Sequence, residues 1–124
     1  MQILIPIAIG GAVGAMARYS ASLGVHGLFG HAFPYGTLFV NVVGSFGIGL
    51  LYVVIMDSTA ELGHYRAPLM IGLLGAFTTF SAFSLETIQL MESGDIWKAG
   101  INIGLNVVLC LVACWSGLAL ARHY

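Results

Sequence analysis

Charged side chains are scarce in this chain of 124 residues. Asp, Glu, Lys and Arg together make up 7% of the sequence, whereas a soluble domain carries about 25%. Hydrophobic residues make up 59%, and the mean hydropathy is +0.97. A domain of this composition would expose large apolar patches in water, so the sequence predicts an integral membrane protein. The net charge of −1 also excludes the basic surface of nucleic-acid-binding proteins, and we expect no nucleic-acid partner.

Residues suited to metal binding or catalysis are also few. The two cysteines, Cys110 and Cys114, lie one helical turn apart in an apolar run, which is typical of small core-filling side chains. The histidines fall in expected loops or near the C-terminus: His26, His31, His64 and His123. No apolar segment pairs a nucleophile with a base, and no zinc ligand set is apparent. The sequence therefore predicts a protein that is not an enzyme.

Four apolar segments are each long enough to cross a bilayer, which takes about 20 residues in a helix. They cover roughly residues 3–23, 35–56, 67–91 and 99–121. Pro68 near the start of the third segment and Gly94 after it mark its ends. The connections are short, so consecutive helices should pack antiparallel. We predict an all-α membrane protein with a single four-helix transmembrane domain over residues 1–124, multi-pass in the plasma (inner) membrane.

A charge bias between the two membrane faces is missing as well. Arg66 and Arg122 lie on the side of the termini, and Arg18 and Lys98 on the opposite side. Cytoplasmic loops normally carry an excess of Lys and Arg, so this balance gives no preferred orientation. A chain that inserts both ways could form an antiparallel homodimer with a two-fold axis in the membrane plane. We expect this dual topology; the alternative is a weak bias decided by another feature.

Polar residues recur on one face of the second segment. Thr37, Asn41 and Ser45 are spaced by four, so they share one face of a helix. In the fourth segment, Asn102 and Asn106 have the same spacing. An amide inside a membrane requires hydrogen-bond partners. Both sets fit either a polar ion pathway or hydrogen bonds that tie helices together.

The third segment combines hydroxyl groups with aromatic rings. Residues 75–84 contain four hydroxyls and three phenylalanines, and unpaired polar groups in hydrocarbon are costly. Phe80 and Phe83 are three residues apart, and Ser81 and Ser84 repeat that spacing. A phenyl ring has a positive edge, so two edges beside hydroxyls could coordinate a small anion. Ring packing is the simpler alternative.

Two further residues of this segment attract attention. Glu86 is its only acid, and a carboxylate inside a membrane is a functional candidate, either in a solvated mouth or as a hydrogen-bonded support. Gly75, followed by two threonines, predicts a break of the third helix at mid-membrane. Carbonyls freed by a break must be buried in protein or bound to something, commonly a cation.

In the first segment, Arg18 lies near the far end and can extend toward the headgroups.

Over its whole length the chain resembles the Fluc (CrcB) fluoride channels. The matching stretches are GGAVGAMARY at residues 10–19, GTLFVN at residues 36–41, and GAFTTFSAFS at residues 75–84, followed by Glu86. The resemblance implies a fluoride-selective channel that exports toxic fluoride passively through two pores of an antiparallel homodimer in the lipid membrane. It also implies a structural Na⁺ at the dimer interface, held by the main-chain carbonyls of Gly75 and Thr78.

The resemblance implies roles for individual residues as well. Phe80 and Phe83 would offer their ring edges to fluoride, and Asn41 would line the pore. The positions that match the polar path or its entrance are Thr37, Ser81, Ser84, Glu86, Arg18 and, less closely, Asn106. Two positions depart from the family pattern. Ala76 stands where a second glycine is usual, and Ala82 where a threonine is usual.

Two other functions suit a four-helix, dual-topology chain of this length. A small multidrug-type exporter needs a carboxylate in its first helix to exchange protons for a cationic drug, and here that segment has Arg18 and no acid. A non-transporting assembly subunit would use its polar residues only to join helices. Ion flux in liposomes would distinguish both from a channel.

Overall fold

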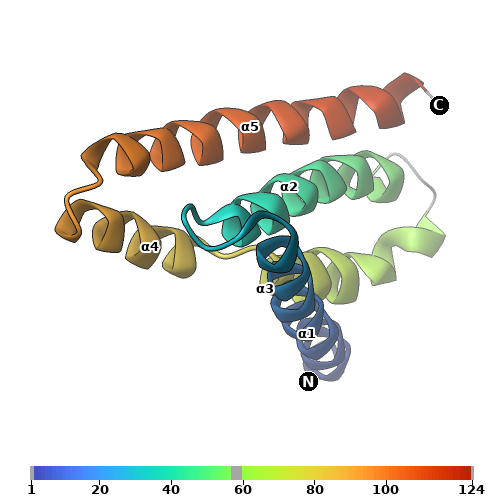
Figure 1. The fold of residues 1–124 in the computed structure, drawn as a ribbon. Helices are drawn as coiled ribbons and strands as arrows, with labels where there is room; N and C mark the ends of the chain where they lie inside the picture. The colour runs from blue at the N-terminus through green and yellow to red at the C-terminus, as the bar shows by residue number, and fades with distance from the viewer. Residues whose placement is uncertain (1, 57–59, 124) are drawn as a thin grey trace.

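The computed structural model describes residues 2–56 and 60–123, and this part of the chain is helical apart from short connections (Figure 1). The elements, in chain order, are α1 (Leu4–Phe29), α2 (Tyr35–Met56), η1 (Ala60–Tyr65), η2 (Arg66–Leu74), α3 (Gly75–Phe77), α4 (Phe80–Glu92) and α5 (Ile96–His123). The short η1 is a 3-10 helix and η2 is a π-helix.

Four helical stretches of the described chain are long and apolar enough to cross a membrane: Leu4–Phe29, Tyr35–Met56, Gly63–Glu92 and Ile96–His123. This confirms the predicted all-α class with four membrane-length segments. The first helix continues past Leu23 to Phe29 and ends at Gly30, whose φ of 84° favours glycine. His26, expected in a loop, therefore lies in the last turn of α1.

Helices α2 and α5 form the most extensive helix pair (Figure 1). Two glycines allow their backbones to approach closely. A Cβ atom added to Gly49 would overlap the carbonyl of Cys114, and one added to Gly117 would overlap the carbonyl of Phe46. Close backbone packing of this kind stabilises helix pairs in lipid, where no hydrophobic force between helices operates.

Helix α1 packs on η2 and α3 in the same manner. Side chains at Gly10 and Gly14 would overlap the carbonyls of Pro68 and Leu73, and one at Gly72 would overlap the carbonyl of Ile7 on α1. Gly10 and Gly14 are four residues apart, a spacing that predicts tight packing of helices in a membrane, and these contacts confirm it.

The third membrane-length stretch is not one continuous α-helix. It consists of η2, α3 and α4, and between α3 and α4 the backbone is extended at Thr78 (φ −84°, ψ 159°) and Thr79 (φ −150°, ψ 118°). Gly75 has helical angles instead (φ −61°, ψ −38°). The interruption therefore lies at the two threonines, one turn after the glycine that signals it in the sequence.

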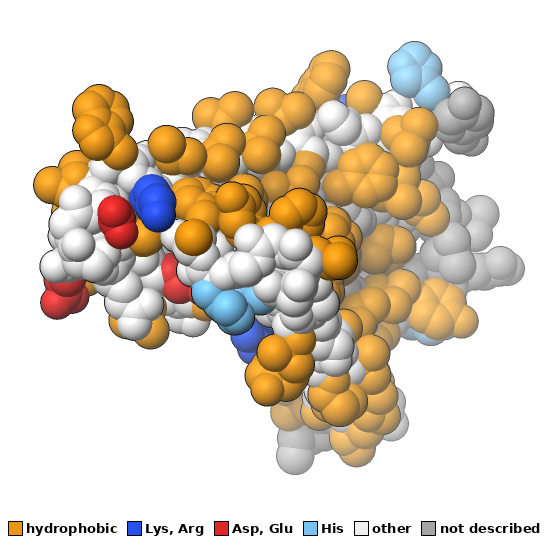
Figure 2. Space-filling model, in the orientation of Figure 1, with side chains coloured by type: hydrophobic (Ala, Val, Ile, Leu, Met, Phe, Trp, Pro, Cys, Tyr) orange, Lys and Arg blue, Asp and Glu red, His pale blue; other side chains and the backbone are white. Residues whose placement is uncertain are grey.

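Apolar side chains cover most of the outside of the molecule, and several polar side chains are buried in its interior beside apolar ones. In Figure 2, hydrophobic side chains spread over most of the face shown, and the acidic ones gather at the end where α4 meets α5. The buried polar side chains are Thr37, Thr87, Asn102 and Asn106. So large an exposed apolar surface is unusual in soluble proteins, and it suits helices that meet lipid or another apolar protein surface.

Candidate functional site

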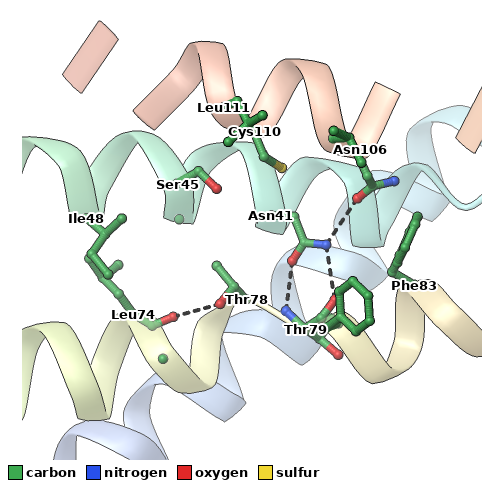
Figure 3. Close-up of a pocket in the computed structure, with 14 residues that line it drawn as sticks. Asn41, Ser45, Ile48, Leu74, Thr78, Thr79, Phe83, Asn106, Cys110 and Leu111 are labelled. Atoms are coloured by element: carbon green, nitrogen blue, oxygen red, sulfur yellow. Dashed lines mark hydrogen bonds between the residues drawn. The ribbon is translucent and has the colours of Figure 1, made fainter. Parts of the chain in front are cut away.

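A cavity of about 420 Å³ lies beside the interruption, between α2, α5 and the start of α4 (Figure 3). Its polar lining includes Asn41, Ser45, Thr78, Thr79 and Asn106, and its aromatic lining consists of Phe80 and Phe83. Among the described residues, none with a charged side chain lines it. Any ion in this cavity would therefore meet dipoles and ring edges instead of a full charge.

Asn41 holds the interrupted backbone in place. Its Oδ1 accepts a hydrogen bond from the N–H of Thr79 at 2.7 Å, and its Nδ2 donates to the carbonyl of the same residue at 3.1 Å (Figure 3). The second Nδ2 proton is directed to Asn106 Oδ1 at 3.1 Å. Both amide protons of Asn41 are thus engaged within the protein. The residue that the resemblance places in the pore wall also fixes the peptide of Thr79 beside it.

Thr79 begins α4 as well as ending the interruption. Its Oγ1 accepts a hydrogen bond from the N–H of Ala82 at 3.1 Å, the standard N-cap contact of a helix. Ser81 Oγ lies 3.3 Å from the same hydroxyl. In the sequence, Thr79 is interpreted only as a sign of the break. A threonine directly before the first residue of a helix is also a recognisable capping signal.

Phe80 and Phe83 lie side by side but in different surroundings. Their ring centroids are 5.3 Å apart and the rings are tilted by 50°, a common arrangement of an aromatic pair. Phe83 is buried, whereas Phe80 is 78% exposed. Ser84 Oγ donates to the carbonyl of Phe80 at 2.9 Å, so this serine hydroxyl is engaged by its own helix.

The interruption redirects the main-chain hydrogen bonds around it. In a continuous helix the N–H of Thr79 would pair with the carbonyl of Gly75, and the N–H of Ala82 with the carbonyl of Thr78. Here the first N–H donates to Asn41 and the second to the hydroxyl of Thr79. The usual helical partners of the Gly75 and Thr78 carbonyls are therefore engaged elsewhere, and both residues line the cavity.

Arg18 reaches the same interruption from α1. Its Nε donates to the carbonyl of Ala76 at 3.0 Å, and the residue is half-buried. In a continuous helix that carbonyl would pair with the N–H of Phe80, so the guanidinium takes over the role of the missing donor. From the sequence, this side chain is expected to extend toward the lipid headgroups; in the structure it lies against the end of α3.

Three residues that were predicted to line the polar path lie near this cavity without lining it. Ser81 and Ser84 are on α4 beside the ring pair, and Thr37 is buried on α2 one turn before Asn41. The polar face predicted on α2 is therefore divided. Its later part, from Asn41 onward, faces the cavity, and its first residue is enclosed by protein.

A second cavity of about 460 Å³ is lined by Glu86, His26, His31 and Asp95, among others. Glu86 Oε1 is buried and has no hydrogen-bond partner within the described chain. His26 Nε2 accepts the N–H of Gly36 at 3.0 Å, so in the neutral ring Nδ1 carries the proton, and it faces His31 Nδ1 at 2.8 Å. The sequence does not predict this grouping, because both histidines are expected in a loop, whereas His26 lies in the last turn of α1.

The chain matches one protein family over residues 5–118, that of the CrcB-like protein, Camphor Resistance (CrcB). It is 53% identical to the fluoride-specific ion channel FluC of Methylococcus capsulatus over 97% of this chain and 53% of that protein. It is 48% identical to the protein of the same name in Geobacter sulfurreducens over 99% of each, and 51% identical to that of Alteromonas mediterranea over 94% of this chain and 91% of the relative.

The chain therefore spans about half the length of the Methylococcus relative and nearly the whole length of the other two. The match extends across all four membrane-length segments and includes the interruption and the ring pair. On this basis the chain belongs to the CrcB family.

Proposed function

We propose that this chain forms a fluoride-selective channel of the plasma membrane, which lets toxic fluoride leave the cell passively. The observation that carries the proposal is the ring pair of Phe80 and Phe83 at the edge of a cavity without charged lining. The names of its relatives in the CrcB family, fluoride-specific ion channels, support the same function.

The chemistry of the site suits fluoride better than chloride. Ring edges and hydroxyls carry partial positive charge, so they can replace part of the water shell of a small, strongly hydrated anion. Because no fixed cation lines the cavity, the anion is held weakly enough to leave again, as conduction requires. A larger anion cannot approach several donors as closely in the same space.

The test is efflux of fluoride from liposomes that contain the purified protein, with chloride as the matched control. We expect rapid passive loss of fluoride and little loss of chloride. Equal efflux of both anions would disprove the proposal, and so would the absence of fluoride efflux from liposomes with correctly folded protein.

We also propose that the channel is an antiparallel, dual-topology homodimer with two pores. Two observations support it. The balance of Lys and Arg between the two membrane faces gives no preferred orientation, and Phe80 is exposed on an open cavity that a second subunit could close. Accessibility of a C-terminal tag from both sides of native membranes is expected. A tag that is accessible from one side only would contradict dual topology.

The third part of the proposal is a structural Na⁺ where the two interruptions meet, near the bilayer midplane. The Gly75 and Thr78 carbonyls have lost their usual helical partners, as described above. Two such carbonyls from each subunit would offer oxygen ligands, which suit a hard cation, and their partial charges favour a monovalent ion. We expect fluoride flux and dimer stability to fall when Na⁺ is exhaustively replaced by a large organic cation. Full activity and stability without Na⁺ would contradict this site.

The two rival functions receive less support. No acid lies within α1, where a small multidrug-type exporter would need one. An assembly subunit without transport activity would show no ion flux in the liposome experiment. The family comparison favours the channel over both, and over an enzyme.

A further inference from the structure

A chain of side-chain hydrogen bonds connects the interruption to the backbone of Phe83 through the interior of the molecule. It passes from Thr79 to Asn41 on α2, from there to Asn106 and Asn102 on α5, and ends through Thr87 on α4. We propose that Thr87 and Asn102 are positioning residues of the ring pair, acting through this relay. The inference rests on the proposed fluoride conduction and assigns a role in it to two residues that do not line the cavity.

Each step of the relay is a short contact. Asn41 Nδ2 lies 3.1 Å from Asn106 Oδ1, and Asn106 Nδ2 lies 3.0 Å from Asn102 Oδ1. Asn102 Nδ2 then donates to Thr87 Oγ1 at 2.9 Å. The hydroxyl of Thr87 donates in turn to the carbonyl of Phe83 at 2.7 Å. All of these distances lie within the range of well-formed hydrogen bonds.

The orientation of every amide in the relay follows from the first one. The peptide of Thr79 has one donor and one acceptor, and they fix which end of the Asn41 amide is oxygen and which is nitrogen. The remaining proton of Asn41 requires an oxygen from Asn106, whose nitrogen must then turn toward Asn102. Asn102 must therefore present its own nitrogen to Thr87. The relay has a single consistent direction.

Burial makes this direction difficult to reverse. Asn102 has 0% exposure, and Thr87 and Asn106 each have 6%. A buried donor or acceptor that loses its partner carries the full desolvation penalty, so a break at one step leaves groups unsatisfied on both sides of it. We infer that the relay is either complete or destabilised as a whole.

The two ends of the relay flank the ring pair. One end holds Thr79, the residue directly before Phe80, and the other holds the carbonyl of Phe83. A hydroxyl bond to the carbonyl four residues earlier is common within helices, and Ser84 makes one to Phe80. The bond of Thr87 differs because α5 donates to the same hydroxyl. The relay therefore sets the distance of α4 from α5 and α2, and with it the place of both rings.

The test compares variants that differ by one group. Thr87→Val keeps the shape of the side chain and removes the hydroxyl, whereas Thr87→Ser keeps the hydroxyl. Fluoride and chloride efflux would be measured from liposomes, per amount of folded protein determined by size-exclusion chromatography. We expect Thr87→Val to lower fluoride flux about five- to tenfold, the factor that corresponds to one net hydrogen bond. Thr87→Ser should stay within about twofold of the native protein by the same measure.

A second arm tests whether the two residues act together. Asn102→Ala removes the amide that bonds Thr87 and leaves the backbone carbonyl that also accepts from Asn106. We expect a loss of flux similar to that of Thr87→Val. The double variant should lose little more than either single variant, because residues of one relay are not additive.

The outcomes separate this inference from the proposed function. If the native protein does not discriminate fluoride from chloride, both fail. If it does, and Thr87→Val or Asn102→Ala conducts like the native protein, only the relay proposal is overturned. If Thr87→Val and Thr87→Ala both fail to fold while Thr87→Ser folds, the hydroxyl serves the fold alone, and the positioning role is overturned as well.

Discussion

The two halves of the third membrane-length segment are held to the rest of the molecule by opposite means. The first half, η2 with α3, lies against α1 through glycines that bring backbone against backbone, chiefly Gly10, Gly14 and Gly72. The second half, α4, is held through side chains, above all by the bond from Asn102 to Thr87. The extended residues Thr78 and Thr79 lie between the two halves, and the bond from Arg18 to the carbonyl of Ala76 adds one side-chain contact at the end of the first half.

This difference matches what each half has to do. Backbone contact through glycine leaves no space for adjustment, so it makes a rigid anchor. Hydrogen bonds between side chains are directional and can be moved by a single substitution, so they suit the half that carries the ring pair. In lipid, close packing and polar contacts are the two main means of joining helices, and this segment uses one on each side of its interruption.

The largest effect is expected where the rigid anchor is broken. Gly14→Ala would place a methyl group onto the carbonyl of Leu73, which is backbone and cannot turn aside. We expect the unfolding free energy to fall by about 3 kcal/mol or more, at the upper end for overpacked sites. If the native protein is itself only a few kcal/mol stable, no assembled channel will form. Thermal unfolding in detergent measures this.

Gly24→Ala is the matched control, because nothing lies within 4 Å of its added Cβ position in the same helix. It should leave stability unchanged or raise it slightly, since alanine favours helix over glycine. Equal behaviour of the two variants would show that backbone contact does not anchor the first half.

A smaller effect, on transport more than on folding, is expected at the ring pair. Phe80→Ile and Phe83→Ile keep the apolar character but remove the ring edges. An edge contact of about 1 kcal/mol corresponds to a loss of flux of several-fold to tenfold. Because Phe83 is buried and Phe80 is exposed, only Phe83→Ile should also lower stability. Fluoride efflux and unfolding temperature, measured on the same preparations, test both statements, and native flux in both variants would assign the rings to packing.

Much of this comparison could be predicted from the sequence, and the reasons are physical. Long apolar runs predict four helices because a bilayer excludes any other spanning structure of this composition. The Gly10–Gly14 spacing predicts close packing, and the density of hydroxyls and phenylalanines predicts the site. Each of these signals is local, since it depends on residues within a single apolar segment.

The side-chain attachments could not be predicted in the same way, because they join residues far apart in the sequence. Nothing in the sequence pairs Asn102 with Thr87, or turns Arg18 toward Ala76 instead of the headgroups. The Asn102–Asn106 spacing leaves two interpretations open, an ion pathway or a tie between helices. In this structure Asn106 bonds Asn41 on α2 and Asn102 bonds Thr87 on α4, and Asn106 also lines the cavity. The spacing of glycines signals the close packing at Gly10 and Gly14, although Gly100 and Gly104 have the same spacing and nothing within 4 Å of an added Cβ. No local signal gives the direction of an amide.

The smallest effect is expected at Ala82, where the family usually has a threonine. Within α4, hydroxyls at Ser84 and Thr87 donate to the carbonyl four residues earlier. The backbone is extended at Thr78 and Thr79, so the carbonyl of Thr78 lies outside the helix, and the hydroxyl of an Ala82→Thr variant lacks that helical acceptor. The N-cap of α4 is already supplied by Thr79. Fluoride flux should therefore change by less than about twofold, which is less than the change that one net hydrogen bond would cause. The dependence of the flux on Na⁺ should be retained. A tenfold change, or loss of the Na⁺ dependence alone, would show that a hydroxyl at this position takes a part in conduction or in Na⁺ binding that Thr79 does not supply.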